Sequence, residues 1–463
     1  MAYDRLTAQD AAFLHLESAS TPMHVGSLAL LEGAPFFDGA GRFRLDEVRA
    51  HIAARLHLAP RFRQRLATVP LSQGRPIWVD DEAFDIEHHV RHTALPNPGD
   101  ESQLLALVGR IQAQLLDRRR PLWEAWFVEN VEGDRVAFIL KTHHAMVDGI
   151  AGVDLASVLL DAERTPVPVT PLPWQPSPPP NRVKLLVDSV VERATQPAEA
   201  LRSVRAALRG PKRVLDRAIG TVRAVEEMGR VVSRLPFNVA VGPQRRVDLV
   251  RVSLDDAKRV RRAFDATVND VVLAAVAGGV RRYLLERGEH VDDLSVRVMV
   301  PVSMRAEDHD ARDLGNRVSA VFAALPVDEA DPVRRLERVR DEMAHLKTSG
   351  EVAGTDALLS LTGWFPPTIF ALASRLVRLQ RFVNLVVTNV PGPQVPMYAF
   401  GARLLEAFPY VGVIDNMAVT VGVLSYDGQL GFALTADGDA VPDVGVLAEG
   451  IEKSMTEVLS CVR

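Results

Sequence analysis

The chain has 463 residues, of which 47% are apolar and 24% are charged, and its formal net charge is −5. This length favours two or more domains, each with its own hydrophobic core. The slightly acidic balance gives no global basic field, so the composition argues against a nucleic-acid partner. The single cysteine, Cys461, leaves no intrachain disulfide framework or thiolate metal cluster, which fits a reducing compartment.

The N-terminus and the longest apolar run give no membrane signal. The first residues, MAYDRLTAQD, include acidic side chains early and lack the apolar stretch of a signal peptide. The longest nearly uninterrupted apolar run, at 271–280, is too short to cross a bilayer. We therefore expect a cytoplasmic protein that contacts membranes only from outside.

The N-terminal part alternates between predicted strands and helices, as judged from hydrophobic periodicity. In chain order they are strand 23–33, helices 45–58 and 102–116, strands 124–131 and 135–144, and helix 149–162. The last of these strands runs into the stretch KTHHAMVDGIAG at 141–152. Two adjacent histidines thus lie at the C-terminal end of a strand, where loops are exposed but held by a rigid element.

Two segments of unusual composition follow. Residues 165–180 contain eight prolines and predict a linker without helix or central strand. Residues 181–234 read as helix, with 12 basic side chains, 6 acidic ones and no aromatic. This segment is either a basic surface for anionic lipid headgroups or a connector whose arginines face water. We favour the connector, because arginine is abundant throughout the chain.

The alternation resumes at about residue 245. In chain order we predict strand 245–254, helix 267–288, strands 294–305 and 317–327, helices 331–348 and 355–380, strand 382–393, a hairpin at 417–437 with a DG turn, and helix 443–460. The pattern predicts an α/β protein with two halves of similar build. The predicted division is a first domain at 1–164, a linker at 165–244 and a second domain at 245–463.

The two adjacent histidines do not have the pattern of a metal site. Zinc sites use three or four ligands at short regular spacing, such as a histidine pair one helical turn apart. In an extended chain His143 and His144 point to opposite faces, so at most one of them can share a centre with Asp148. The other histidine group, at 88–92, lacks a following aspartate and glycine and reads as an exposed strand edge.

The same residues suit general base catalysis. A neutral imidazole takes a proton from an alcohol or amine near neutral pH when its ring is held and its tautomer fixed. One histidine can reach into a cavity while the other packs behind it. Asp148 can hold the imidazole or anchor the loop, and Gly149 lets the turn enter its helix where a Cβ would clash. The alternative is a pair of satisfied core histidines, against which the combination of four fixed positions argues.

The segment HHAMVDG at 143–149 is similar to the HHxxxDG motif of acyltransferases built like chloramphenicol acetyltransferase, a superfamily that includes condensation domains of peptide synthetases. Other segments resemble the bacterial wax ester synthase/diacylglycerol acyltransferase family in particular. They are DAAFLHLES, TPMHVG, PLW at 121–123, ND at 269–270, PVSMR at 301–305, LGN at 314–316 and NVPGP at 389–393. The resemblance covers nearly the whole chain. It implies two chloramphenicol acetyltransferase-like domains with a central cleft or tunnel, joined by the proline-rich and helical linker.

The resemblance also implies roles for the motif residues. His144 would be the general base, which removes the proton from an acceptor hydroxyl as that oxygen attacks the thioester of acyl-CoA. Direct attack needs no acyl-enzyme, and the chain has no G-x-S-x-G elbow to form one. His143 and Asp148 would be structural. Asn269 is a candidate to support the transition state; alternatively, it caps a helix that begins at Asp270.

Further residues receive expectations from the same resemblance. Glu17 matches a family acidic residue thought to lie near the histidine, where its carboxylate would stabilise an imidazolium. Pro121, Leu122 and Trp123 would shape the acyl or acceptor pocket, or form an ordinary turn with a buried tryptophan. Arg305 would meet a phosphate of CoA or pair with a carboxylate, and NVPGP would be a rigid turn after a central strand.

These features predict an O-acyltransferase that moves a long-chain acyl group from acyl-CoA to diacylglycerol, and also to fatty alcohols to make wax esters. No cofactor is implied, since acyl-CoA is a substrate. We expect peripheral contact with a membrane or lipid inclusion. One alternative is a condensation-type enzyme that uses carrier-protein thioesters, and another is a non-catalytic lipid-binding or inclusion protein. The ordered family motifs argue against the first, and the intact motif residues argue against the second.

Overall fold

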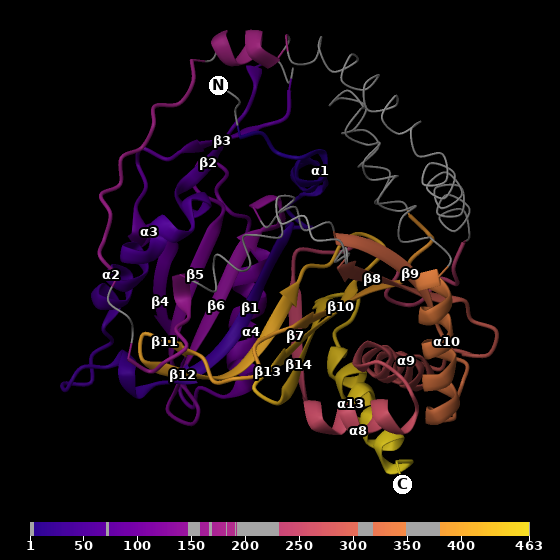
Figure 1. Ribbon diagram of the computed structural model, residues 1–463. Coiled ribbons are helices and arrows are strands. Elements are labelled where there is room, and N and C mark those ends of the chain that lie inside the picture. Colours follow the sequence, from indigo (N-terminus) through magenta and orange to yellow (C-terminus); the bar gives the residue numbers. More distant parts are fainter. Residues whose placement is uncertain are drawn as a thin grey trace.

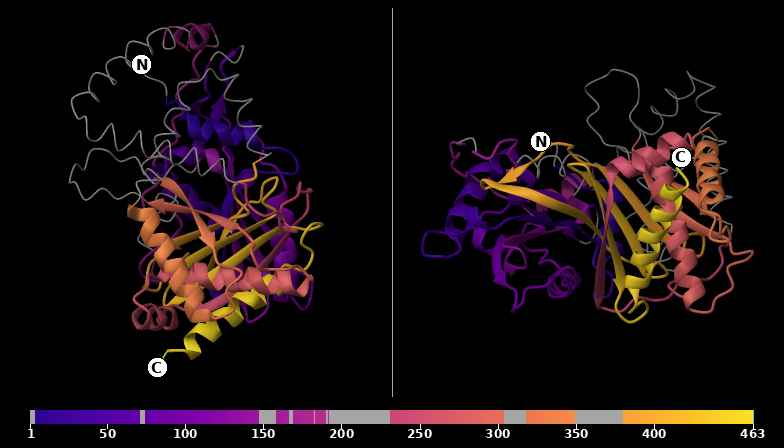
Figure 2. Two further views of the ribbon diagram at one scale, coloured as in Figure 1. Left: turned by 90° about the vertical axis from the view of Figure 1, so that its right-hand side faces the viewer. Right: turned by 90° about the horizontal axis from the view of Figure 1, so that it is seen from below.

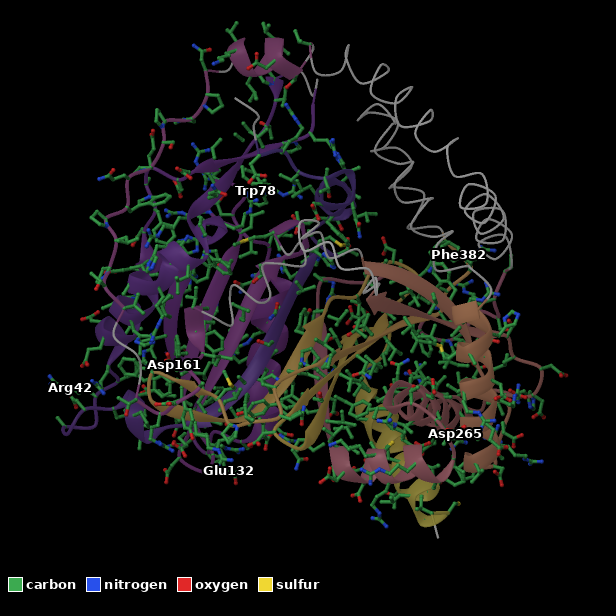
Figure 3. The ribbon with its side chains drawn as sticks, viewed as in Figure 1. Arg42, Trp78, Glu132, Asp161, Asp265 and Phe382 are labelled. Atoms are coloured by element: carbon green, nitrogen blue, oxygen red, sulfur yellow. The ribbon has the colours of Figure 1, made fainter. Side chains whose placement is uncertain are left out.

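Two six-stranded sheets lie side by side in the computed structural model, each with its own helices (Figures 1 and 2). The structure describes residues 4–70, 74–146, 158–165, 169–181, 183–189, 191, 231–303, 318–348 and 380–462. A small third sheet pairs β2 (Gln64–Ala67) with β3 (Ile77–Asp80). Side chains fill the space within both halves, as the sticks in Figure 3 show.

The first large sheet has the strand order β11-β12-β1-β6-β5-β4. Its strands are β11 (Tyr398–Ala399), β12 (Ala402–Val411), β1 (His24–Glu32), β6 (Arg135–His143), β5 (Trp123–Val131) and β4 (Val90–Ala94). β1 and β6 run antiparallel at the centre, and only the outer pair β4 and β5 is parallel. The helices of this half are α1 (Ala8–Leu16), α2 (Leu45–Arg55), the short α3 (Ile86–His89) and α4 (Glu101–Ala113).

β12 comes from the C-terminal part of the chain yet pairs with β1. We predicted no strand at 402–411. This run contains Pro409, and proline is unusual in a central strand. The structure resolves this conflict. β11 pairs only with the first two residues of β12, so at Pro409 the outer side of β12 needs no ladder hydrogen bond within this sheet.

The second large sheet has the strand order β7-β14-β13-β10-β8-β9. Its strands are β7 (Arg245–Ser253), β14 (Gln429–Asp437), β13 (Val419–Tyr426), β10 (Leu385–Pro391), β8 (Val296–Ser303) and β9 (Val318–Leu325). Among its described residues, four helices belong to this half: α8 (Leu254–Ala263), α9 (Val268–Glu286), α10 (Pro332–Thr348) and α13 (Val444–Ser460). α9 is buried through its middle and packs closely on α13. Gly278 permits this approach, because a Cβ at that position would lie 2.2 Å from Ser454 Oγ on α13.

The predicted α/β architecture of two similar halves is confirmed, and most predicted strands and helices match the observed ones. Residues 169–181 contain neither helix nor strand, as predicted for the linker, and 183–189 are helical. The predicted helix is wrong at 231–234, which is irregular. Residues 192–230 of that predicted helix lie outside the described residues. The same holds for 355–379 of the predicted helix 355–380 and for most of the predicted helix 149–162. The division at 165 and 245 stays a prediction.

The histidine group at 88–92 is not an exposed strand edge throughout. His88 and His89 lie in α3, and His89 is buried between Phe84 and Trp123 with its ring stacked on both. His89 Nδ1 also bonds to the carbonyl of Trp123. Only His92 lies on the edge strand β4. The prediction failed because His89 is covered by a ring five residues before it and by Trp123, which is distant in sequence.

Candidate active site

His143 and His144 lie where β6 leaves the centre of the first sheet. His143 is the last residue of β6, and His144 begins a turn of 3-10 helix, His144–Met146. The backbone N–H of His144 donates to the carbonyl of Met23 at 2.7 Å, directly before β1. The turn is therefore fixed to the neighbouring central strand, and the two rings enter different surroundings.

His143 is fully buried and both of its ring nitrogens face a polar group. The N–H of Ala145 donates to His143 Nδ1 at 3.0 Å, so this nitrogen carries no proton. The other ring nitrogen, Nε2, lies 3.3 Å from Glu17 Oε1. These contacts fix the tautomer and orientation of His143 and fit the structural role that we expected for it.

Glu17 closes the C-terminal end of α1 behind the motif, and its side chain is 4% exposed. Its carboxylate accepts from the guanidinium of Arg118 at 2.7 Å and from the N–H of Met23 at 3.3 Å. Burial raises the pKa of Glu17, but the hydrogen bonds and charges of His143 and Arg118 outweigh this and lower it to about 2. The expected proximity to a histidine is thus present, but the partner is His143.

Two further buried groups on this side were not singled out from the sequence. His24 pairs with His143 in the β1–β6 register, and its Nδ1 donates to the carbonyl of Gln112 at 3.2 Å. Burial and the charge of Lys141 lower the pKa of His24 to about 3, so its ring is neutral at neutral pH. Burial lowers the pKa of Lys141 to about 8, while Glu124, at 3.8 Å, favours its charged form. This side of β6 is therefore a buried polar network.

His144 has mainly apolar surroundings. Its ring stacks on Phe13 with 3.8 Å between ring centroids. Burial lowers the pKa of His144 to about 4, so the imidazole is a free base at neutral pH. Its Nδ1 is buried without a hydrogen-bond partner. Asp148 and Gly149, the remaining motif residues, lie outside the described residues, as does Arg305.

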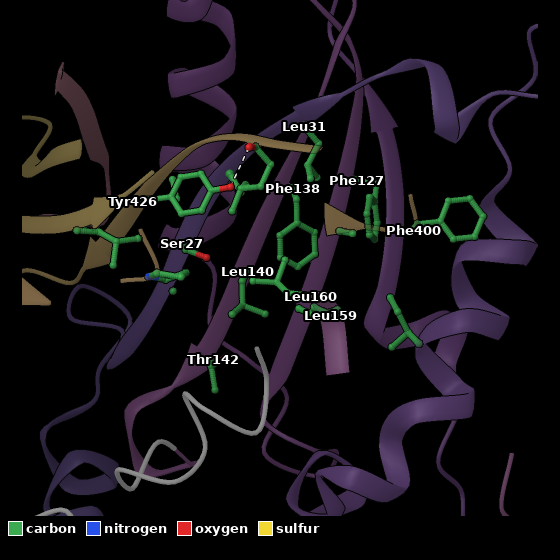
Figure 4. A pocket seen from close by; sticks show the side chains of 18 of the residues that line it. Ser27, Leu31, Phe127, Phe138, Leu140, Thr142, Leu159, Leu160, Phe400 and Tyr426 are labelled. Atoms are coloured by element: carbon green, nitrogen blue, oxygen red, sulfur yellow. Dashed lines mark hydrogen bonds between the residues drawn. The ribbon is translucent and has the colours of Figure 1, made fainter. Parts of the chain in front are cut away.

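A cavity of about 460 Å³ adjoins the motif in the first half. Alternate residues of the two central strands form its floor: Val25, Ser27, Ala29 and Leu31 from β1, and Phe138, Leu140 and Thr142 from β6 (Figure 4). Thr142 precedes His144 by two residues. The second half contributes Val390, Pro393, Leu424 and Tyr426. A central cleft or tunnel was expected from the resemblance, but these lining residues were not identified, although the period-two alternation in both strands marked which side chains share a face.

The ND motif lies at the start of α9. Thr267 caps this helix, and Thr267 and Asp270 bond to each other's backbone N–H in a capping box. The helix begins at Val268, so the alternative in which Asn269 caps a helix starting at Asp270 is wrong. Asn389 Nδ2 instead donates to Asn269 Oδ1 at 3.5 Å.

Asn389 belongs to the NVPGP segment, whose first three residues end β10 and whose last two are neither helix nor strand. The predicted turn is therefore wrong for the first three residues, where the strand continues. Its neighbour Val390 lines the cavity. We had treated this segment as a turn only, and its link to Asn269 and to the cavity was missed. The contact ties the two C-terminal motifs together close to the cavity, which Thr142 of the histidine strand also lines.

The PLW residues at 121–123 pack next to the histidine motif and do not line the cavity. Leu122 and Trp123 are buried, and the carbonyl of Leu122 accepts from the N–H of His143 at 2.9 Å. Trp123 Nε1 donates to the carbonyl of Phe62, whose own ring lines the cavity. The cavity lining includes neither these two residues nor Pro121. Their role in substrate binding stays a prediction, and the observed contacts are those of a buried turn.

Within the residues that the structure describes, no group of three or more His, Cys, Asp or Glu side chains is placed to hold a metal ion. No single described helix is long and apolar enough to cross a membrane. α8 and α9 pass that test together, but they are bent by 99°, and α9 is largely buried in the core.

Comparison with known proteins identifies the family. The model of the wax ester synthase/diacylglycerol acyltransferase catalytic domain matches residues 6–272, and that of the family's C-terminal domain matches 314–458. The chain belongs to this family. It is 34% identical to "Probable diacyglycerol O-acyltransferase tgs1" of Mycobacterium tuberculosis over 99% of this chain and 96% of that protein. It is also 34% identical to "Probable diacyglycerol O-acyltransferase tgs2" of the same species, over 99% of both chains.

Solved structures agree with this assignment. A wax ester synthase/diacylglycerol acyltransferase from Marinobacter aquaeolei VT8 superposes with a TM-score of 0.70 at 26% identity, covering 99% of both chains. The first condensation domain of the CDA synthetase superposes with a TM-score of 0.56 at 17% identity, covering 100% of this chain and 97% of that one. At that identity the second likeness shows a shared fold and nothing more.

Proposed function

We propose that this protein transfers a long-chain acyl group from acyl-CoA to diacylglycerol, and also to fatty alcohols, with His144 as general base. The observation that carries the proposal is the contrast at the motif: a family histidine kept as a neutral base in apolar surroundings, beside a cavity that suits an alkyl chain. Family membership supplies the reaction class. The site supplies the candidate base.

The proposed reaction is a direct transfer. His144 takes the proton of the acceptor hydroxyl while that oxygen attacks the thioester carbonyl. The carbon–sulfur bond then breaks, and the imidazolium returns the proton to the CoA thiolate, so the free thiol leaves. No metal or covalent acyl-enzyme enters the scheme. Since burial of His144 favours the neutral ring, the base is ready at neutral pH, and its imidazolium is a transient acid.

The oxyanion formed during attack needs a hydrogen-bond donor. Asn269 is the proposed donor, because Asn389 holds its amide oxygen and thereby fixes how the amide nitrogen is turned. A preorganised donor of this kind typically contributes about 10²–10³ in rate. The capping box at Thr267 and Asp270 supports it by holding the first turn of α9.

Peripheral attachment to a membrane or lipid inclusion is the second part of the proposal. Val183 and Val187 lie one helical turn apart in helical residues 183–189 and are 69% and 53% exposed. They lie near the start of the basic segment 181–234. Apolar and electrostatic contributions to binding of an anionic lipid surface therefore coincide there. Flotation with anionic vesicles tests this. Val183→Asp with Val187→Asp should lose flotation, whereas Leu285→Asp on α9 should keep it; equal flotation would contradict the attachment.

The decisive assay of the function follows free CoA released from palmitoyl-CoA by purified protein. Diacylglycerol, hexadecanol and no acceptor are compared, each repeated with His144→Ala and with the exposed His290→Ala as control. Acceptor-dependent release that is lost only in His144→Ala supports the proposal. Folded protein that releases no CoA with any acceptor would exclude it and point to carrier-protein thioesters or to lipid binding without catalysis.

A further inference from the structure

The cavity has two distinct ends, which the strand register defines. β1 and β6 pair from His24 opposite His143 to Glu32 opposite Arg135. The motif end of the cavity therefore lies at Val25, and the far end at Leu31. At a rise of about 3.4 Å per residue, the six steps from Val25 to Leu31 span roughly 20 Å. This floor is long enough for one extended alkyl chain.

The turn between β11 and β12 lies beyond the far end. β12 is antiparallel to β1, and Leu404 pairs with Leu31, so the preceding turn residues Phe400 and Gly401 project past Leu31. Phe400 itself lines the cavity. In Figure 4 its ring lies on the side of the cavity away from Thr142.

Phe400 is both part of the cavity wall and close to the surface. Its ring stacks on Phe36 at 5.9 Å and meets His51 edge-on at 5.6 Å, measured between ring centroids. The guanidinium carbon of Arg44 lies 5.0 Å from the ring centroid, and the Arg44 side chain is 34% exposed. Phe400 thus touches the cavity and a solvent-exposed side chain at the same time.

The backbone at Phe400 does not explain the choice of residue. Phe400 and Gly401 have φ values of 53° and 80°, the pattern of a type I′ hairpin turn, which favours asparagine or glycine at both positions. A bulky residue in this left-handed region is uncommon. The presence of phenylalanine is therefore better explained by what its ring does than by the turn.

We propose that Phe400 closes the far end of the cavity and so sets the longest alkyl chain that the enzyme accepts. The inference rests on the proposed acyltransferase function, and the ligand class is the alkyl chain of an acyl thioester or of a fatty acceptor. Each methylene that fits inside the cavity improves binding by about fourfold. A chain that reaches Phe400 gains nothing more and must bend or displace the ring.

The test compares chain-length profiles of purified full-length wild type, Phe400→Ala and Phe43→Ala. Phe43 stacks on Phe36 at 5.7 Å in the same aromatic cluster but does not line the cavity, so it controls for loss of that cluster. One arm varies the donor (lauroyl-, palmitoyl- and docosanoyl-CoA) with hexadecanol fixed. The other arm varies the alcohol (dodecanol, hexadecanol and docosanol) with palmitoyl-CoA fixed.

In Phe400→Ala the kcat/KM ratio of the 22-carbon to the 16-carbon substrate should rise by about tenfold or more in one arm, since several methylenes gain room. This ratio compares docosanoyl-CoA with palmitoyl-CoA in the donor arm and docosanol with hexadecanol in the alcohol arm. In Phe43→Ala it should stay within about twofold of wild type. The responding arm identifies the chain that the cavity holds. An active Phe400→Ala with unchanged ratios in both arms overturns the proposal, whereas an inactive wild type defeats the proposed function instead. If Phe400→Ala does not fold, Phe400→Leu should shift the same ratio in the same direction, and an unchanged ratio again overturns the proposal.

Discussion

Two adjacent histidines occupy opposite environments on the two sides of one strand end. His143 faces a buried polar network in which Ala145 and Glu17 engage its two nitrogens. His144 stacks on Phe13 and has a buried Nδ1 without a partner. The residue type is the same, so the neighbours decide the role. A histidine whose two nitrogens face a backbone N–H and a carboxylate is positioned for structure, and one that stacks on an apolar ring next to the cavity-lining strand is available for chemistry.

The largest expected effect separates these two residues directly. His144→Ala should lower kcat/KM by ~10²–10⁴-fold and change the free energy of unfolding little, because it removes mainly one ring stack. His143→Ala should instead lower the free energy of unfolding by about 3 kcal/mol, since it leaves a buried carboxylate short of a partner. Urea unfolding and steady-state rates on both variants measure this. The contrast fails if the two variants lose the same stability and the same rate.

The second effect concerns the proposed oxyanion donor. Asn269→Ala should lower kcat by about 10²–10³-fold with little change in KM, because the hydrogen bond matters mainly in the transition state. Asn389→Ala removes the group that orients Asn269 and should cost about tenfold, the effect of one neutral hydrogen bond. Initial rates over a substrate series measure both. Equal losses from the two variants would remove the distinction between donor and support.

A smaller effect tests the polar network behind His143. The pKa of Glu17 is about 2 in the folded protein, below its usual 4.5, so its charge stabilises the fold above pH 4.5 and this contribution disappears as the pH falls toward 2. Glu17→Gln should lower the free energy of unfolding by about 2 kcal/mol at neutral pH. Urea titrations should show this difference shrinking as the medium becomes more acidic. A difference that does not depend on pH would mean that shape, and not charge, matters at Glu17.

Much of the fold could be predicted because the sequence pattern is local. Strand β6 and helix α9 are marked by long apolar runs, and the DG turn marks the β13–β14 hairpin. β12 was missed, and its Pro409 fits a strand only because β11 leaves that side of β12 unpaired. The roles of Glu17 and Asn389 depend on contacts between segments far apart in the chain. The motif resemblance named Glu17, but only the structure showed that it faces His143.

The central claim is that His144 acts as a base kept neutral by burial, and the pH dependence of kcat/KM tests it most directly. The profile would be recorded from about pH 3 to about pH 9, with circular dichroism to verify folding, since kcat/KM reports the pKa values of the free enzyme. Burial lowers the pKa of His144 to about 4, so the rate should hold through mildly acidic pH and fall only as the pH drops through about 4. A fall centred near 6.5, the value of an exposed histidine, would contradict the account.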